Sequence, residues 1–340
     1  MDIQEIVALS VKHNVSDLHL CSGGMARWRR AGRLEKAPFN APSPEALLSQ
    51  WLSDAQNAEW RHRRQLDFAL ALEGCPRLRA SAFMQNGGVS LVLRLLPTRC
   101  PTLDELHTPV ALAELLHEDS GLILVTGATG SGKSTTLAAM VDYLNHHLAG
   151  HILTLEDPLE FLHTSDRCLI SQREVGLHAP SFAEALRVAL RQDPNVILLG
   201  ELRDSETIRL ALTAAETGHL VLATLHTRGA AEAIERLLDV FPAAEKEPVR
   251  CQLASSLCAV LAQKLQANGA GGRVALFELL VNTSAVGNLI REGKTHQLAG
   301  VMQTSLQSGM QTFSQSYQQR LKAGMLQKAE DISFPLSPFV

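Results

Sequence analysis

The chain has 340 residues, 46% of them hydrophobic, and a formal net charge of −4 at pH 7. This length admits two or three domains, whereas the weakly acidic charge and an aromatic content of 4% argue against a nucleic-acid partner. No apolar run is long enough to span a membrane, the first residues lack a signal-peptide core, and no C-x-x-C pair occurs, so we expect a cytoplasmic protein with no direct membrane insertion and no structural zinc.

The first part of the chain, residues 1–97, is predicted to be a small α+β domain. Strands are expected over residues 66–72 and 90–96, and Asn86-Gly87-Gly88 joins two strand-like stretches as a hairpin turn would. Three prolines close together then predict a linker over residues 98–110.

Strands and helices alternate after this linker. Short apolar strands are predicted over residues 122–126, 152–155, 196–199 and 220–224, with helical material between them. This βαβ rhythm is typical of a parallel sheet covered by helices on both faces. The sequence therefore predicts an α/β domain over residues 111–330.

The C-terminal part of this domain is expected to turn helical. One helical face is predicted to carry Val249, Leu253, Leu257, Val260, Leu261 and Leu265. A turn over residues 269–272, a strand over 273–280 and two or three helices within 283–327 follow. Residues 331–340 are expected to form a loose tail.

A glycine-rich segment after the first of these strands matches the phosphate-binding loop pattern G-x-x-x-x-G-K-[ST]. Its members are Gly127, Ala128, Thr129, Gly130, Ser131, Gly132, Lys133, Ser134 and Thr135. With a strand before it and a helical pattern after it, the loop can hold a polyphosphate with backbone N–H groups and a helix N-terminus. We expect Lys133 to reach the β- and γ-phosphates of ATP and Ser134 to bind Mg²⁺.

A carboxylate, Glu201, follows the predicted strand at residues 196–199. Because the carboxyl ends of parallel strands face the ligand, we expect Glu201 to orient or polarise the attacking water. The preceding position, where many such ATPases carry an aspartate that holds Mg²⁺, is Gly200. Another group therefore has to serve the metal.

Three more carboxylates, Glu156, Asp157 and Glu160, follow the predicted strand at residues 152–155. Carboxylate oxygens suit Mg²⁺, which makes Glu156 and Asp157 candidate metal ligands and Glu160 a candidate for positioning water. The alternative interpretation is a solvated acidic turn.

Two histidines flank the predicted strand at residues 220–224, His219 before it and His226 after it. As neutral or protonated donors, both are candidates for sensing the γ-phosphate. The alternative is that they make local hydrogen bonds at the strand ends. The spacing does not fit a zinc site.

Four segments in this order resemble the boxes of the secretion ATPase superfamily, which drives type II secretion and type IV pili. They are residues 127–135 (Walker A), 152–161 (aspartate box), 193–204 (Walker B) and 216–227 (histidine box). The resemblance extends over residues 3–327. The chain lacks the extra N-terminal sequence and the four-cysteine zinc insertion of the assembly and secretion motors, so it is most similar to the pilus retraction branch.

The resemblance implies an N-terminal PAS-like domain, a RecA-like P-loop NTPase domain and a homohexameric ring with ATP between subunits. Arg79 and Arg94 match arginines that approach the nucleotide in the family. The resemblance also implies an inner-membrane platform protein as partner, through which the chain would be peripheral at the inner membrane.

Two positions depart from the family pattern. Gly287 stands where the retraction motif A-I-R-N-L-I-R-E has its first arginine, and Ser81 replaces an asparagine. Neither lies in the phosphate loop, so ATP binding is expected to persist. Two alternatives to a pilus motor stay open: a nucleotide-dependent regulatory ring with weak hydrolysis, and a nucleic-acid motor.

Overall fold

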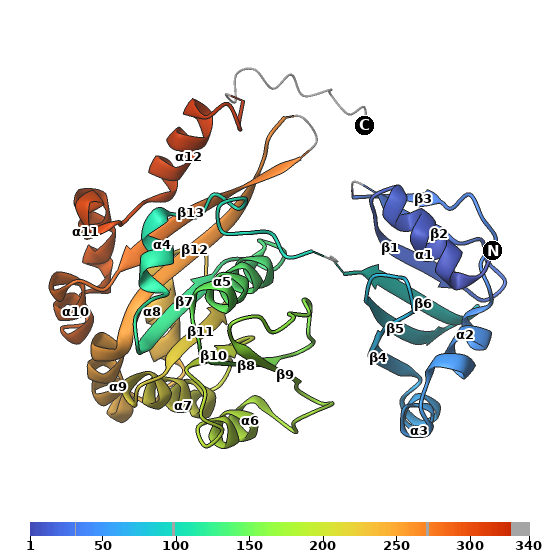
Figure 1. The fold of residues 1–340 in the computed structure, drawn as a ribbon, viewed down its shortest axis with the longest axis horizontal. Coiled ribbons are helices and arrows are strands. Elements are labelled where there is room, and N and C mark those ends of the chain that lie inside the picture. Colours follow the sequence, from blue (N-terminus) through green and yellow to red (C-terminus); the bar gives the residue numbers. More distant parts are fainter. Residues whose placement is uncertain (31, 97–98, 270–271, 328–340) are drawn as a thin grey trace. The chain divides into compact units, whose positions relative to one another are not determined.

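The computed structural model describes residues 1–30, 32–96, 99–269 and 272–327, and it divides into two compact units between Arg99 and Cys100 (Figure 1). Each unit has a hydrophobic core of its own. Three predicted features lie wholly or partly outside the described residues. They are the tail, residues 97–98 where the linker begins, and the turn at residues 270–271.

The N-terminal unit is built on an antiparallel sheet with the strand order β3-β2-β1-β6-β5-β4. The strands are β1 (Val15–Cys21), β2 (Arg27–Arg30), β3 (Arg33–Lys36), β4 (Gln65–Leu70), β5 (Leu78–Gln85) and β6 (Gly88–Leu95), and the helices are α1 (Ile3–Lys12), α2 (Pro44–Trp51) and α3 (Asp54–Arg63). Gln85 pairs with Gly88 across the two-residue turn, which confirms the predicted hairpin. The unit is thus α+β, as expected.

The second unit contains a mixed sheet with the strand order β13-β12-β7-β11-β10-β8-β9. All neighbouring strands in it are parallel except β12 and β13, which are antiparallel. The strands are β7 (Gly121–Thr126), β8 (His151–Glu156), β9 (Leu169–Glu174), β10 (Val196–Leu199), β11 (Leu220–Leu225), β12 (Leu257–Ala267) and β13 (Arg273–Val281). This arrangement confirms the α/β fold.

Helices cover both faces of this sheet. The side chains of β7 alternate between two cores, because Leu122 and Leu124 enter one core and Ile123 and Val125 enter the other. The first core is shared with α6 (Phe182–Ala189), α7 (Ser205–Glu216), α8 (Ala230–Asp239), α9 (Ala243–Ser256), α10 (Ser284–Arg291) and α11 (Leu298–Thr304). The second is shared with α4 (Val110–Leu115) and α5 (Lys133–His147), and α12 (Phe313–Lys322) lies beside β13 (Figure 1).

The expectation of one helix through Val249 and Leu265 is wrong. The helix α9 ends at Ser256, and the chain continues directly as β12. β12 pairs with β7 on one side and β13 on the other. Its first half is buried on both faces, because Leu257 and Val260 enter the first core and Ala259 and Leu261 enter the second, so this part is apolar without a strand-like alternation. Cys251 is accordingly exposed on α9, whereas Cys258 lies in the strand.

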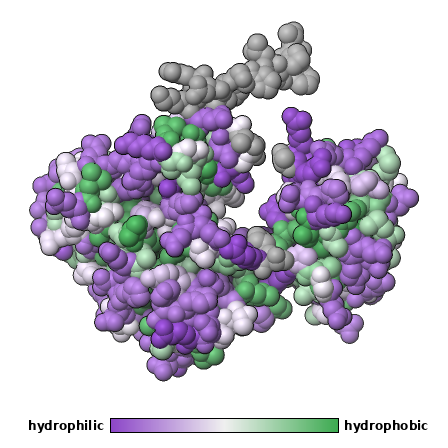
Figure 2. Space-filling model, turned by 45° about the horizontal axis from the view of Figure 1, so that its top comes forward, coloured by the Kyte–Doolittle hydropathy of each residue, from purple (hydrophilic) through white to green (hydrophobic). Residues whose placement is uncertain are grey.

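None of the helices in the described ranges is long and apolar enough to cross a bilayer. Figure 2 shows that hydrophilic residues cover most of the visible surface of both units, with hydrophobic residues scattered among them.

Candidate functional site

The glycine-rich loop connects the end of β7 to the start of α5, as the motif predicts. Gly130 and Gly132 have φ values of +77° and +94°, a region that glycine adopts without strain. Gly132 is the N-cap of α5, and no side chain caps this helix. The first-turn N–H groups and the helix dipole thus favour an anion at the loop.

Lys133 is buried beneath this loop. Its Nζ donates to the carbonyl oxygens of Gly127 (2.8 Å) and Ala128 (3.2 Å) and lies 3.4 Å from Nδ1 of His226. Burial lowers the pKa of Lys133, and the negative charges of Glu201 and Glu160 oppose this effect. The lysine is therefore held at the loop by carbonyl groups and two nearby carboxylates.

Glu201 lies just beyond the end of β10 and is paired on both oxygens. Its Oε2 is 3.1 Å from Nε2 of His226, and its Oε1 forms an ion pair with Arg203. Burial raises the pKa of Glu201, but the hydrogen bonds from Arg203 and His226 outweigh it and lower the pKa. The group is thus kept ionised, which suits a carboxylate that has to accept a hydrogen bond from water.

A pair of threonines fixes the segment after β11 against the end of β7. The Oγ1 atoms of Thr126 and Thr227 are 2.7 Å apart, and the backbone N–H of Thr227 donates to Thr126 Oγ1 (3.0 Å). His226 precedes Thr227, so these bonds hold its backbone beside the phosphate loop. The structure therefore brings Lys133, Glu201 and His226 to one edge of the sheet.

The three carboxylates after β8 lie in different surroundings. Glu156 is hydrogen-bonded by Thr154 Oγ1 (2.8 Å), and burial raises its pKa to about 7. Asp157 is exposed, and its charge acts on Arg203. The negative charge of Glu160 raises the pKa of Lys133, which connects this carboxylate to the loop.

The expectation that His219 lies near the γ-phosphate is wrong for the phosphate loop of its own chain. Its carbonyl oxygen accepts from the N–H of Gly121 (3.0 Å), the first residue of β7, and its Nδ1 lies 3.0 Å from the carbonyl oxygen of Ala214. The strand β11 spans about 20 Å, and it carries His219 and His226 to opposite edges of the sheet. His219 instead makes local hydrogen bonds, which was the alternative interpretation.

Arg79 and Arg94 belong to the N-terminal unit and are directly opposite each other on β5 and β6. Nε of Arg94 donates to Oδ1 of Asp17 (2.8 Å), and Asp17 is itself buried. Burial raises the pKa of Asp17, whereas the hydrogen bonds from Arg94 and Ser16 lower it, with a net decrease. The two arginines thus lie on one face of the antiparallel sheet.

Sequence reasoning missed several residues around the loop. Arg203, Thr126, Thr227, Thr136 and Gln263 all contact site residues or the loop. Arg203 offered one signal, since an arginine two positions after a strand-end carboxylate can pair with it. Gln263 gave no signal, because it lies over a hundred positions from the loop and in a segment expected to be helical.

The residues present fit a nucleoside triphosphate and Mg²⁺. Glycine lets the loop approach the neighbouring strand closely: a Cβ on Gly127 would lie 2.4 Å from the carbonyl oxygen of Gln263. The uncapped α5 N-terminus and Lys133 suit phosphate oxygens, and the hydroxyl of Ser134 suits Mg²⁺. The metal would neutralise charge on the phosphates.

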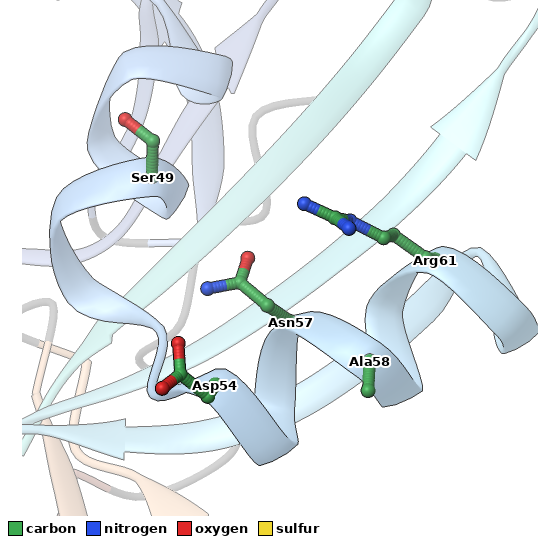
Figure 3. Close-up of a pocket in the computed structure, with 5 residues that line it drawn as sticks. All are labelled: Ser49, Asp54, Asn57, Ala58 and Arg61. Atoms are coloured by element: carbon green, nitrogen blue, oxygen red, sulfur yellow. The ribbon is translucent and has the colours of Figure 1, made fainter.

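A hollow lies in the N-terminal unit between α2 and α3 (Figure 3). It has a volume of about 460 Å³ and is lined by Ser49, Asp54, Asn57, Ala58 and Arg61. All of these except Asn57 are exposed. It therefore lacks the buried polar groups of a specific ligand site.

Comparison with known proteins places these features in a family. The family described as "Type II/IV secretion system protein" matches residues 3–332. The chain is 68% identical over 326 residues to the uncharacterized protein YggR of Escherichia coli K12, covering 96% of this chain and 100% of YggR. It is 46% identical over 331 residues to the type IV pilus retraction ATPase PilT of Pseudomonas aeruginosa, covering 96% of each.

A solved structure agrees with these relatives. The crystal structure of the pilus retraction motor PilT with bound ADP matches with a TM-score of 0.89 and 41% identity, covering 98% of this chain and 96% of that one. This likeness extends through both units.

Proposed function

The chain belongs to the Type II/IV secretion system protein family and is an ATPase of the pilus motor type, and from this premise we propose that it hydrolyses ATP to power the retraction of a type IV pilus-like filament. The observation that carries the proposal is the convergence of Lys133, Glu201 and His226 at the phosphate loop. A homohexameric ring at an inner-membrane platform protein is part of the same proposal. It draws on the similarity to PilT, whose printed descriptions name pilus retraction and bound ADP.

The chemistry assigned to each residue follows from its surroundings. Backbone N–H groups of residues 128–135 and the Nζ of Lys133 bind phosphate oxygens, and Ser134 serves Mg²⁺, with Glu156 and Asp157 as further candidates. Glu201, kept ionised by Arg203 and His226, accepts a hydrogen bond from the water that attacks the γ-phosphorus. His226 bridges that carboxylate and Lys133, so it reports the state of the loop to Glu201. Glu160 assists in positioning water.

Arg79 and Arg94 are assigned to the nucleotide as well. Two guanidinium groups directly opposite each other repel unless an anion lies between or beside them, and Asp17 neutralises only part of their charge. We assign the remaining positive charge to the phosphates of ATP in the ring.

The test is Mg²⁺-dependent ATP turnover of the purified protein, with its mass in solution recorded alongside. Glu201→Gln should reduce turnover by about a hundredfold or more while ATP still binds. The matched control is Glu206→Gln, the same change in an exposed carboxylate that pairs with Arg187. A hexamer that turns over ATP and is silenced only by the first change supports the motor; ATP binding without turnover in the wild type would favour a regulatory ring.

The retraction role needs a test in cells. Pilus retraction should be lost on deletion of the gene and restored by the wild-type chain but not by Glu201→Gln. Restoration by Glu201→Gln would show that turnover at this site does not drive retraction.

A further inference from the structure

One buried side chain connects the phosphate loop to a strand far away in the sequence. Gln263 lies on β12, one residue after Ala262, which pairs with Thr126 at the end of β7. Its Nε2 donates to the carbonyl oxygen of Ser131 (2.8 Å), and its Oε1 accepts from Thr136 Oγ1 (2.7 Å). It therefore joins the loop to the first turn of α5 through a single amide.

The fit between Gln263 and the loop extends to the glycines. A Cβ on Gly132 would lie 2.8 Å from Nε2 of Gln263, and a Cβ on Gly127 would lie 2.4 Å from its carbonyl oxygen. β12 thus occupies the space that these two glycines leave free. Part of the glycine pattern of the motif is explained by this strand, and not by the phosphates alone.

The hydrogen bonds of Gln263 to Ser131 and Thr136 are buried. Gln263, Ser131 and Thr136 are 3%, 6% and 0% exposed, so water cannot replace a lost partner. An unpaired buried carbonyl or hydroxyl is costly, and the loop would move to satisfy it. The hydroxyl of Ser131 has no hydrogen-bond partner among the described residues, so the carbonyl bond to Gln263 is a main polar anchor of that residue.

We propose that Gln263 is a positioning residue that sets the shape of the phosphate loop and thereby the affinity for nucleotide. This inference rests on the proposed function, since it takes ATP to bind at that loop. The side-chain amide of Gln263 bonds Ser131 and Thr136, and not Lys133 Nζ or Glu201. It therefore acts on phosphate binding in the ground state and the transition state alike, which changes KM and leaves kcat nearly constant.

The test compares two full-length variants, each of which loses one buried glutamine amide. Gln263→Met keeps the volume of the side chain and removes both hydrogen bonds to the loop. Gln311→Met is the matched control, because Gln311 is also buried and donates to the carbonyl oxygen of Phe277, the residue paired with Gln263 on β13. ATP and ADP affinities, KM, kcat and amide hydrogen exchange of residues 128–134 are measured for both.

We expect Gln263→Met to weaken ATP and ADP binding and to raise KM by roughly tenfold, with kcat within about threefold of wild type. The loop amides should exchange faster in this variant without any nucleotide present. Gln311→Met should leave both the loop exchange and the affinity at wild-type values. Wild-type affinity and loop exchange in Gln263→Met, or equal losses in the two variants, would overturn the inference.

A second variant keeps the test decisive if Gln263→Met does not fold. Thr136→Val removes one of the two hydrogen bonds and should weaken binding by about threefold, whereas wild-type affinity would contradict the inference. In the double variant the two losses should not add, since both act through the same amide. If wild-type protein binds no ATP, the proposed function fails together with the affinity claim; if only Gln263→Met behaves as wild type, the inference alone fails.

Discussion

The carboxylate of Glu201 and the imidazole of His226 meet beyond the ends of neighbouring strands β10 and β11, with 3.1 Å between Oε2 and Nε2. The other ring nitrogen of His226 faces the ammonium of Lys133 at 3.4 Å. A neutral imidazole with its proton on Nε2 satisfies both contacts, because Nδ1 can then accept from Lys133. The histidine thus connects the loop lysine to Glu201.

Replacing this histidine should uncouple the two groups. His226→Ala is expected to lower ATP turnover by about tenfold or more, since Glu201 loses one of its two partners, while ATP affinity changes by less than about threefold. Steady-state kinetics and equilibrium binding measure the two effects. His296→Gln, a change in an exposed imidazole outside the site, should alter neither. Unchanged turnover in His226→Ala would remove His226 from the site.

Removing the loop cation should abolish nucleotide binding. Lys133→Ala deletes the buried ammonium that the loop carbonyl groups hold, and we expect at least a hundredfold loss of ATP affinity. Calorimetric titration measures it. Lys246→Ala removes a half-buried lysine that pairs with Asp239 and serves as the control. Wild-type affinity in Lys133→Ala would refute the assignment of the phosphate loop.

Glu156 should make the protein less stable as the pH rises. Burial raises its pKa from the ordinary 4.5 to about 7, so the folded chain retains a proton that the unfolded chain has already released. The stabilisation is complete below about pH 4.5 and is lost as the pH rises through about 7.

Without nucleotide and Mg²⁺, Glu156→Gln should therefore gain up to about 3 kcal/mol in free energy of unfolding at pH 8 relative to wild type, and much less at pH 5. Urea denaturation at several pH values tests this. Glu206→Gln, at an exposed position, should show no such difference. An equal effect of Glu156→Gln at both pH values would contradict the raised pKa.

Gly287 is buried within α10, in a place where a small side chain fits. A Cβ there would meet the carbonyl oxygen of Ala254 at 3.4 Å and Oδ1 of Asn282 at 3.5 Å. Gly287→Ala should raise the free energy of unfolding by about 0.5–1 kcal/mol through helix propensity, with ATP turnover unchanged. Gly300→Ala in α11 is the control, because no atom lies within 4 Å of its new Cβ and the change in the free energy of unfolding then reflects helix propensity alone. A loss of stability in Gly287→Ala alone would show that the contact at 3.4 Å is too close.

The arginine that the retraction motif implies at position 287 is a separate matter. Oδ1 of Asn282 is buried without a hydrogen-bond partner among the described residues, and it faces position 287. If α10 couples the ring to its partner, Gly287→Arg should increase pilus retraction in cells beyond Gly287→Ala. Equal retraction by the two variants would make the glycine neutral for coupling.

Local patterns were sufficient for most of the fold and for the loop. The strands β7, β8, β10 and β11 are short apolar runs, and the loop motif carries its own structural context, so both were predictable. β12 was not, because a strand buried on both faces has no alternation and its apolar residues also fit a helical spacing. The short strand β9 was also missed. It lies at the edge of the sheet and its sequence is mostly polar, so it has no apolar run that would indicate a strand.

The site was predictable only where sequence order determines position in space. Glu201 and His226 follow parallel strands, and such ends meet at one edge of the sheet. Gln263 reaches the loop through the pairing of β12 with β7, which depends on the whole sheet. His219 was misplaced because closeness in the sequence was taken for closeness in space, although a strand separates it from His226.

The strand β11 also has a consequence for how substitutions in the histidine box act. The block of residues 216–227 contains the whole of β11, so its two ends lie at opposite ends of that strand. Substitutions before Leu220 act where the strands begin, and substitutions after Leu225 act where they end. The block therefore consists of two separate groups of residues, one before β11 and one after it. Substitutions along the block should give two distinct phenotypes, one for each group.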